Sequence, residues 1–199
     1  MKVFHYTKGN RLNDIFNDGY IATEMKRTLS YTRKNTDYVW LTEKQTYPKT
    51  AMPMLSMFPE TNLTIHLQHK GVVVDLDKIG KVFGNFYRFG FDSADTRLTK
   101  WFFSEERKVA RNKNEWISME SVANKVGDEV RSFWIAKNDL QLENFSLEVF
   151  ENGRWNTILE NASLANLTKE QLSTVNTHKQ LSKEMCSKWS VPTTMQLAA

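Results

Sequence analysis

Cysteine is nearly absent from this chain, since Cys186 is the single one among 199 residues. No disulfide can therefore form within the chain, which excludes a disulfide-stapled secreted scaffold. The sequence also lacks any run of about 18 apolar residues, the length that a membrane-spanning helix needs. Residues 1–6 lack the apolar stretch of a signal peptide. Together these absences predict a soluble, cytoplasmic protein.

Clustered metal ligands are missing as well. The chain has four histidines, of which His66 and His69 stand three residues apart. No cysteine, aspartate or second histidine pair accompanies them at ligand spacing, and a structural zinc ion needs four ligands. The sequence therefore predicts no metal site and no metal cofactor.

Neither sign of charge dominates the composition. Lys and Arg number 27 against 23 Asp and Glu, which gives a formal net charge of +4, and the isoelectric point is about 9.1. This mild basic excess is compatible with a nucleic-acid partner. Six Trp, six Tyr and twelve Phe provide a large aromatic core. The length suits one domain with an appendage.

The first twenty residues contain the clearest local pattern. Residues 2–7 form a short apolar and aromatic run, which predicts a strand that ends in hydrogen-bonding side chains. Asn10 stands at the position of a helix N-cap and Gly19 at that of a C-terminal glycine. Between them, apolar residues recur at helical spacing at Leu12, Ile15 and Phe16. Such a strand-to-helix junction favours a ligand, because the N-terminal amides of a helix point toward it.

Further strands and helices are expected in the rest of the chain. Alternating or apolar segments predict strands at 38–42, 71–76, 86–91, 128–135, 141–150 and 154–158. Helix signals mark starts near Pro48 and Thr168, and a further helix over 114–126. The pair Asn152–Gly153 predicts a tight hairpin, so the C-terminal strands are expected to be antiparallel. The last helix is expected to end near Pro192, before a loose tail.

Cations stand beside aromatic residues at two places. Arg88 interrupts the aromatic strand over 86–91, where it pairs with a carboxylate or touches a phosphate, and the ion pair is the favoured interpretation. A denser group predicts nucleic-acid binding, because single-strand binders stack bases on aromatic rings and neutralise phosphates. Its members are Lys100, Trp101, Arg107, Lys108, Arg111 and Lys113. For any one of them the favoured alternative is a solvated helix face beside a core aromatic cluster.

The opening of the chain resembles that of a known superfamily. The motif H-Y-T at residues 5–7, followed by a helix of pattern L-x-x-I-F-x-x-G, is similar to the start of ADP-ribosyltransferase-like folds. The closer similarity is to DarT-type DNA ADP-ribosyltransferases and related uncharacterised bacterial and phage proteins. The aromatic strand over 39–42 and the segment beginning at Glu129 match later parts of the pattern in the right order. The resemblance covers residues 1–160, except for the stretch 59–100.

This resemblance implies a fold, a substrate and an acceptor. The fold would be α+β, with a split, mostly antiparallel sheet and packed helices over residues 1–160. Residues 161–199, which the resemblance does not cover, are expected from the capping box at Thr168 to add a C-terminal accessory helix and a tail. NAD would be the substrate, and DNA the preferred acceptor of its ADP-ribose group. The biological setting would be that of a toxin or of conflict between phage and host.

The resemblance also assigns roles to single residues. The residues implied to hold NAD are His5, Tyr6, Thr7, Trp40 and Tyr47. Trp40 and Tyr47 remain alternatives for the ring that stacks on nicotinamide. The superfamily carries its catalytic glutamate at the start of a late strand. Glu129 is therefore preferred as the catalytic carboxylate, supported by His5, over Glu148 and then Glu120.

A glutamate suits this reaction on physical grounds. Cleavage of the nicotinamide glycosidic bond builds positive charge on the ribose, and a nearby carboxylate stabilises that charge and can deprotonate the acceptor. The same logic serves a second hypothesis, an enzyme that cleaves a nucleobase N-glycosidic bond in DNA without NAD. A third hypothesis is non-catalytic, a module that binds nucleic acid or protein as an inhibitor. NAD binding separates the first hypothesis from the other two.

Overall fold

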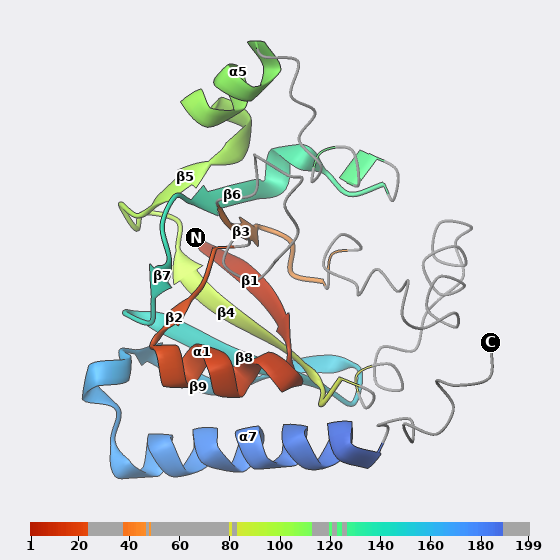
Figure 1. The fold of residues 1–199 in the computed structure, drawn as a ribbon, viewed down its shortest axis with the longest axis vertical. Coiled ribbons are helices and arrows are strands. Elements are labelled where there is room, and N and C mark those ends of the chain that lie inside the picture. Colours follow the sequence, from red (N-terminus) through yellow and green to blue (C-terminus); the bar gives the residue numbers. More distant parts are fainter. Residues whose placement is uncertain are drawn as a thin grey trace, which may run out of the picture.

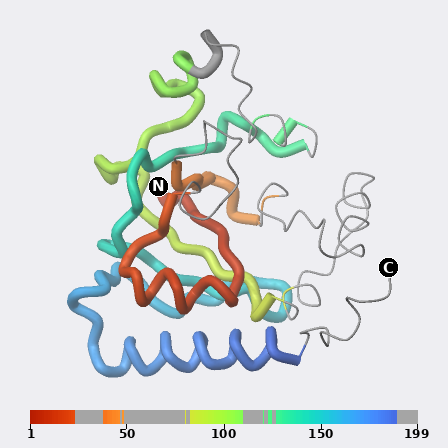
Figure 2. The backbone as a smooth tube through the Cα atoms, viewed as in Figure 1, coloured from red at the N-terminus to blue at the C-terminus, as the bar shows by residue number. Residues whose placement is uncertain are grey.

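The computed structural model describes residues 1–23, 38–46, 48, 80, 83–112, 120, 123–124 and 127–188. Helices and antiparallel strands combine within these ranges, so the fold is α+β as the sequence predicts (Figures 1 and 2). Among the described residues, seven strands form one sheet in the order β5-β6-β3-β1-β4-β8-β9, and β2 pairs with β7 separately. All of the pairings are antiparallel.

The strands of the large sheet are β1 (Lys2–Lys8), β3 (Val39–Thr42), β4 (Phe86–Asp92), β5 (Leu98–Lys100), β6 (Phe133–Ala136), β8 (Phe145–Glu151) and β9 (Arg154–Ala162). The small sheet consists of β2 (Tyr20–Ile21) and β7 (Leu140–Gln141). The helices are α1 (Leu12–Asp18), α5 (Glu105–Asn112) and α7 (Lys169–Lys188). Short 3-10 turns occur at η1 (Gly9–Arg11), η3 (Trp101–Phe103), η4 (Val130–Ser132) and η5 (Leu164–Asn166).

The first strand lies in the middle of the large sheet. β1 pairs with β4 along its whole length, from Lys2 opposite Asp92 to Lys8 opposite Phe86. Successive side chains of a strand point to opposite faces. We call the face that carries Val3, packed against α1, the helix face, and the face that carries Phe4 the far face.

The helices α1 and α7 cover the helix face of the sheet and lie side by side (Figures 1 and 2). The apolar residues of α1 predicted from their spacing are all buried in one core with β4 and β8. The ring of Phe16 lies 5.9 Å from that of Phe89. Gly19 ends α1 with φ of 81°, a backbone conformation that glycine adopts without steric cost.

The C-terminal helix α7 is part of this core. It begins with a reciprocal capping box, in which the Thr168 hydroxyl accepts from the Gln171 amide and the Gln171 side chain accepts from the Thr168 amide. Val175 is 3% exposed and packs in the main core. Ser182 is buried and donates to the carbonyl of Gly84 at 2.8 Å. α7 therefore packs on the main core and on the turn at Gly84.

A second, aromatic core lies on the far face of β3 and β6. Trp101 of η3 is 1% exposed and packs with Phe133 and Ile135 of β6. Its ring lies 4.9 Å from that of Trp40. This cluster fixes η3, and with it the start of α5, to the edge of the sheet.

Three predicted boundaries differ from the structure. Asn10 is not the N-cap of α1, because it lies inside η1 and Arg11 takes the capping position without a side-chain hydrogen bond. The late strand begins at Phe133 rather than Asp128, because η4 closes first with a bond from the Ser132 amide to the Glu129 carbonyl. The segment predicted as one strand over 141–150 divides into β7 and β8.

Several predicted elements fall outside the described residues. These are the strand over 71–76, the body of the helix near Pro48, most of the helix over 114–126, and the tail after Pro192. By contrast, the hairpin predicted at Asn152–Gly153 joins β8 and β9, and both residues have positive φ, as a tight hairpin turn requires.

Candidate functional site

The large sheet is loosely joined at one place, between β1 and β3, which we call the seam. Within the described residues, β1 pairs with β3 at Phe4 and Thr42 alone. On either side of the seam the pairing is continuous, over all of β1 with β4 and all of β3 with β6. A junction with few ladder pairs leaves polar backbone groups of both strands for other partners, so we take the seam as the candidate site.

Hydrogen bonds connect the predicted site residues at the seam. The Nδ1 atom of half-buried His5 lies 2.9 Å from the carbonyl oxygen of Trp40 in β3. Two residues further along β3, the Thr42 hydroxyl lies 2.9 Å from the Ser132 hydroxyl. The Ser132 hydroxyl in turn donates to the Glu129 carbonyl at 2.7 Å. The strand-one motif and the turn that carries Glu129 are thus both attached to the short strand β3.

The strand alternation divides the H-Y-T motif between two faces. His5 and Thr7 point to the helix face, where Thr7 is 6% exposed. Tyr6 points to the far face, opposite Arg88 of β4. These three side chains therefore do not converge on one point, and a single ligand can contact all of them only by passing through the seam.

The segment after β3 crosses the far face beside Tyr6. The Tyr6 hydroxyl donates to the Lys44 carbonyl at 2.5 Å, and Arg88 donates to the Gln45 carbonyl at 2.6 Å. The Lys44 amide also donates to the Thr42 hydroxyl at 3.2 Å. Burial raises the pKa of Tyr6, against the lowering effect of its hydrogen bond to Arg88. Tyr6 is therefore a neutral donor that fixes this segment.

The neighbouring carboxylates of Asp128 and Glu129 lie in different environments. Asp128 is buried, with 1% of its side chain exposed, and binds the Lys44 ammonium at 2.8 Å. Glu129 is exposed, and no ion pair joins it to another described residue. Only Glu129 of this pair therefore offers an uncommitted carboxylate near the seam.

Arg88 forms the ion pair that the sequence favours. Its Nε and Nη2 atoms both donate to one carboxylate oxygen of Glu148, the former at 2.8 Å. The guanidinium lies between the rings of Phe4 and Trp155, 4.0 and 4.5 Å from their centres. Glu148 lies opposite Arg88 on the far face, so its side chain points away from the face that carries His5. The structure thus places Glu148 in a structural ion pair.

Of the two aromatic candidates for nicotinamide stacking, the structure describes Trp40. Trp40 packs in the second core, between Trp101 and Phe133, and it is half-buried. This position matches core packing, and its exposed edge lies on the far face. Tyr47 lies outside the described residues. Glu120, the lowest-ranked carboxylate, is buried and accepts from Trp101 Nε1 at 2.8 Å.

Three cations of the predicted basic group have carboxylate partners. Lys100 binds Glu43 at 2.6 Å, Arg107 binds buried Glu120 at 2.6 Å, and Lys108 pairs with Glu105. Trp101 is buried and cannot stack on a base. Lys113 and the side chain of Arg111 lie outside the described part of the structure. Exposed groups in this region include Phe103, 70% exposed, and Arg131, whose guanidinium lies 4.9 Å from the centre of the Phe102 ring.

Glu43 is a site-adjacent residue that the sequence did not single out. It follows β3, and one carboxylate oxygen accepts from both Lys100, at 2.6 Å, and Trp134 Nε1, at 2.8 Å. Burial raises the pKa of Glu43, but these two hydrogen bonds outweigh it and lower the pKa overall. The only sign of this role in the sequence is the position of Glu43 directly after a predicted strand. Its partners could not be predicted, because they lie far along the chain.

The part of the chain that the structure describes contains no group of three or more His, Cys, Asp or Glu side chains placed to hold a metal ion. None of the described helices combines the length and the apolar composition that crossing a membrane requires. Comparison of the chain with protein-family models, with curated proteins and with solved structures finds no match.

Proposed function

We propose that this protein is an NAD-dependent ADP-ribosyltransferase whose acceptor is nucleic acid, with DNA preferred. The observation that carries the proposal is the seam between β1 and β3. His5 is hydrogen-bonded to the backbone of β3, and the turn beginning at Glu129 is bonded to the same strand through Ser132. A strand-one histidine and the turn that carries an exposed glutamate, distant in sequence, are therefore both attached to the same short strand.

The proposed chemistry uses these residues as follows. The bond between ribose C1′ and the nicotinamide nitrogen breaks, and nicotinamide leaves with the bonding electron pair. The positive charge that develops on the ribose is stabilised by the Glu129 carboxylate. A nitrogen or oxygen of the acceptor base then bonds to C1′, and its proton passes to Glu129 or to water. His5, held by the β3 carbonyl, orients the ribose during both steps.

The choice of nucleic acid as acceptor is supported by the surface around η3. Phe103 is exposed, and its ring lies 5.3 Å from that of Phe102, on which Arg131 also packs. An exposed aromatic ring beside an arginine that has no carboxylate partner among the described residues suits base stacking and phosphate contact. The net charge of +4 has the favourable sign.

The experiment that tests the proposal is incubation of the purified protein with labelled NAD and separate pools of DNA, RNA and protein. We expect label on DNA and release of nicotinamide. Glu129→Gln should lower turnover by roughly 10²- to 10³-fold, because it removes one preorganised charge. NAD affinity should change far less, since the ground-state ribose lacks the charge that develops later. Glu184→Gln, an exposed glutamate of α7, is the matched control and should retain full activity.

Three other outcomes would contradict the proposal. Release of a free base from DNA without NAD would indicate an N-glycosidase on this scaffold. Binding of nucleic acid or protein with no NAD consumption would indicate a non-catalytic module. Unchanged NAD affinity in a folded His5→Ala variant would remove His5 from the site.

A further inference from the structure

We propose that the cleft between η1–α1 and α7 binds a small phosphate monoester, such as a nucleoside 5′-monophosphate. The cleft has a volume of about 560 Å³, which is within the usual range for small-molecule sites. Its lining residues are Gly9, Asn10, Asn13, Asp14, Asn176, Lys179, Gln180, Lys183 and Cys186. This site lies on the helix side of the sheet and does not depend on the transferase proposal.

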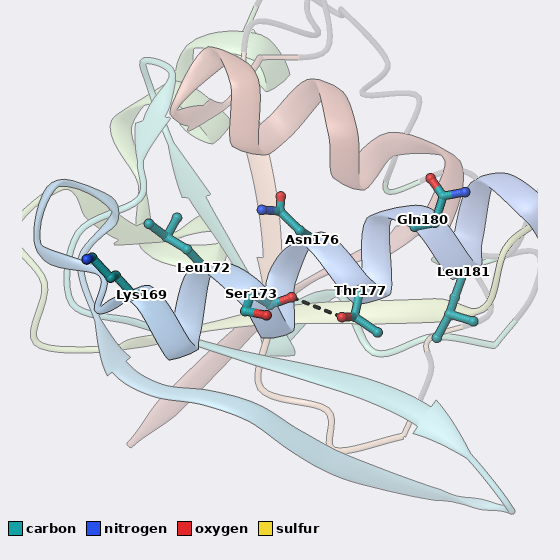
Figure 3. A pocket seen from close by; sticks show the side chains of 7 residues that line it. All are labelled: Lys169, Leu172, Ser173, Asn176, Thr177, Gln180 and Leu181. Carbon is teal, nitrogen blue, oxygen red and sulfur yellow. Dashed lines mark hydrogen bonds between the residues drawn. The ribbon is translucent and has the colours of Figure 1, made fainter.

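Side chains from two separate elements line the cleft. Asn10 belongs to η1 and Asn13 to α1, whereas Asn176 and Gln180 belong to α7. Figure 3, a view of a neighbouring pocket along α7, shows Asn176 and Gln180 on the side of the helix that faces α1 and Leu181 on the other side. Amide side chains both donate and accept hydrogen bonds, so these walls suit a ligand rich in hydroxyl or ring nitrogen groups.

The cleft also carries uncompensated positive charge. Lys179 and Lys183 are one helical turn apart on α7, and neither forms an ion pair with a described carboxylate. The Lys179 ammonium donates instead to the neutral amide oxygen of Asn17 at 3.1 Å. An anionic oxygen is a stronger acceptor than an amide, so a phosphate can replace that contact. Most other described cations of the chain already have carboxylate partners.

Two carboxylates near the cleft are themselves occupied. Asp14 lines the wall and pairs with Arg11 at 3.5 Å. Glu184, next to Lys183, accepts from the Gln180 side chain at 2.8 Å. Glu184 keeps its charge, because Gln180 is neutral, but Arg11, Lys179 and Lys183 against Asp14 and Glu184 still leave a surplus of one positive charge.

The base of the cleft is rigid, which lowers the cost of binding. The Gly9 amide donates to the Asn85 carbonyl at 2.9 Å, and the Ser182 hydroxyl donates to the Gly84 carbonyl at 2.8 Å. A Cβ atom at Gly9 would overlap the Gly84 carbonyl, and one at Gly84 would overlap the Ser182 backbone, so η1 and α7 both pack closely against the turn at Gly84. The two walls are thus held at a fixed separation before any ligand arrives.

The test is calorimetric titration of the full-length protein with adenosine 5′-monophosphate, ribose 5-phosphate, inorganic phosphate and uncharged adenosine. We expect saturable binding of the two esters, weaker binding of inorganic phosphate, and none of adenosine. Lys179→Met and Lys183→Met should each raise the dissociation constant of the monophosphate about tenfold or more, because each removes a charge-assisted bond. Lys188→Met, at the end of the same helix and outside the cleft, is the control and should leave it unchanged.

The opposite results would overturn the inference. These are no saturable binding of the monophosphate up to about 10 mM, equal binding of adenosine, or equal weakening by Lys188→Met. Tighter binding of an oligonucleotide without a terminal phosphate would assign the cleft to a nucleic-acid backbone instead. A parallel titration with NAD separates the two proposals, because the Lys183→Met variant should bind NAD as the wild type does.

Discussion

The substitution Glu148→Gln distinguishes a structural role of Glu148 from a catalytic one. The Arg88–Glu148 pair is buried, with 7% and 11% of the two side chains exposed. Removing one partner of such a pair leaves the other charge buried without compensation, which typically costs 3–5 kcal/mol, and we expect roughly 3 kcal/mol here because the amide oxygen still accepts one bond. A chain of this size loses roughly 2–4 °C of melting temperature per kcal/mol. The expected decrease is therefore about 6–12 °C.

The assay combines a thermal melt, a urea titration and the NAD turnover measurement on the same samples. Replacing both partners by apolar residues, in Arg88→Met with Glu148→Leu, should cost less than the two single substitutions together, because no buried charge is left. NAD turnover of Glu148→Gln should remain near the wild-type value at a temperature where the variant is folded. A variant that melts normally but has lost turnover would refute this reasoning and make Glu148 the catalytic carboxylate.

Three further predictions test how the helix side of the molecule is held together. Burial lowers the pKa of His178 below its ordinary 6.5, so the unfolded chain takes up the proton first and the stability of the fold should decrease as the pH drops through about 6.5. Urea midpoints measured above and below that pH should show this loss of stability. The loss should be smaller in His178→Gln. Gly9→Ala should destabilise by about 2 kcal/mol or more, because the new methyl group overlaps the Gly84 carbonyl; an unchanged urea midpoint would contradict the close approach. Thr168→Ala should cost about 1 kcal/mol by removing the helix cap, whereas Thr177→Ala, in the middle of α7, should cost less.

Local signals in the sequence predicted most of the described elements. The strand at the start of the chain, the glycine that ends α1, the hairpin at residues 152–153 and the capping box of α7 each depend on a few adjacent residues. The ion pair of Arg88 was also favoured, because a charge within an aromatic strand needs a partner. In each case the physical cause lies within one segment or one strand.

What the sequence could not provide is the pairing of distant groups. The basic segment after β5 predicted a cationic surface, but Lys100 and Arg107 meet the carboxylates of Glu43 and Glu120 across the fold. Such partners depend on which strands are neighbours, and the sheet order does not follow the chain order. For the same reason the sequence could not show that Asp128 is buried against Lys44 while its neighbour Glu129 is exposed.

The central position of β1 has a consequence for how the protein is made. β1 pairs with β4, which in turn pairs with β8, so β1 waits for partners that are synthesised later. Its turn η1 acquires its last neighbour only when α7 has emerged. During synthesis the edges of β1 are therefore unpaired and apolar, a state prone to aggregation. Stable folding should thus wait until α7 has emerged, and a nascent chain stalled before α7 should remain sensitive to protease.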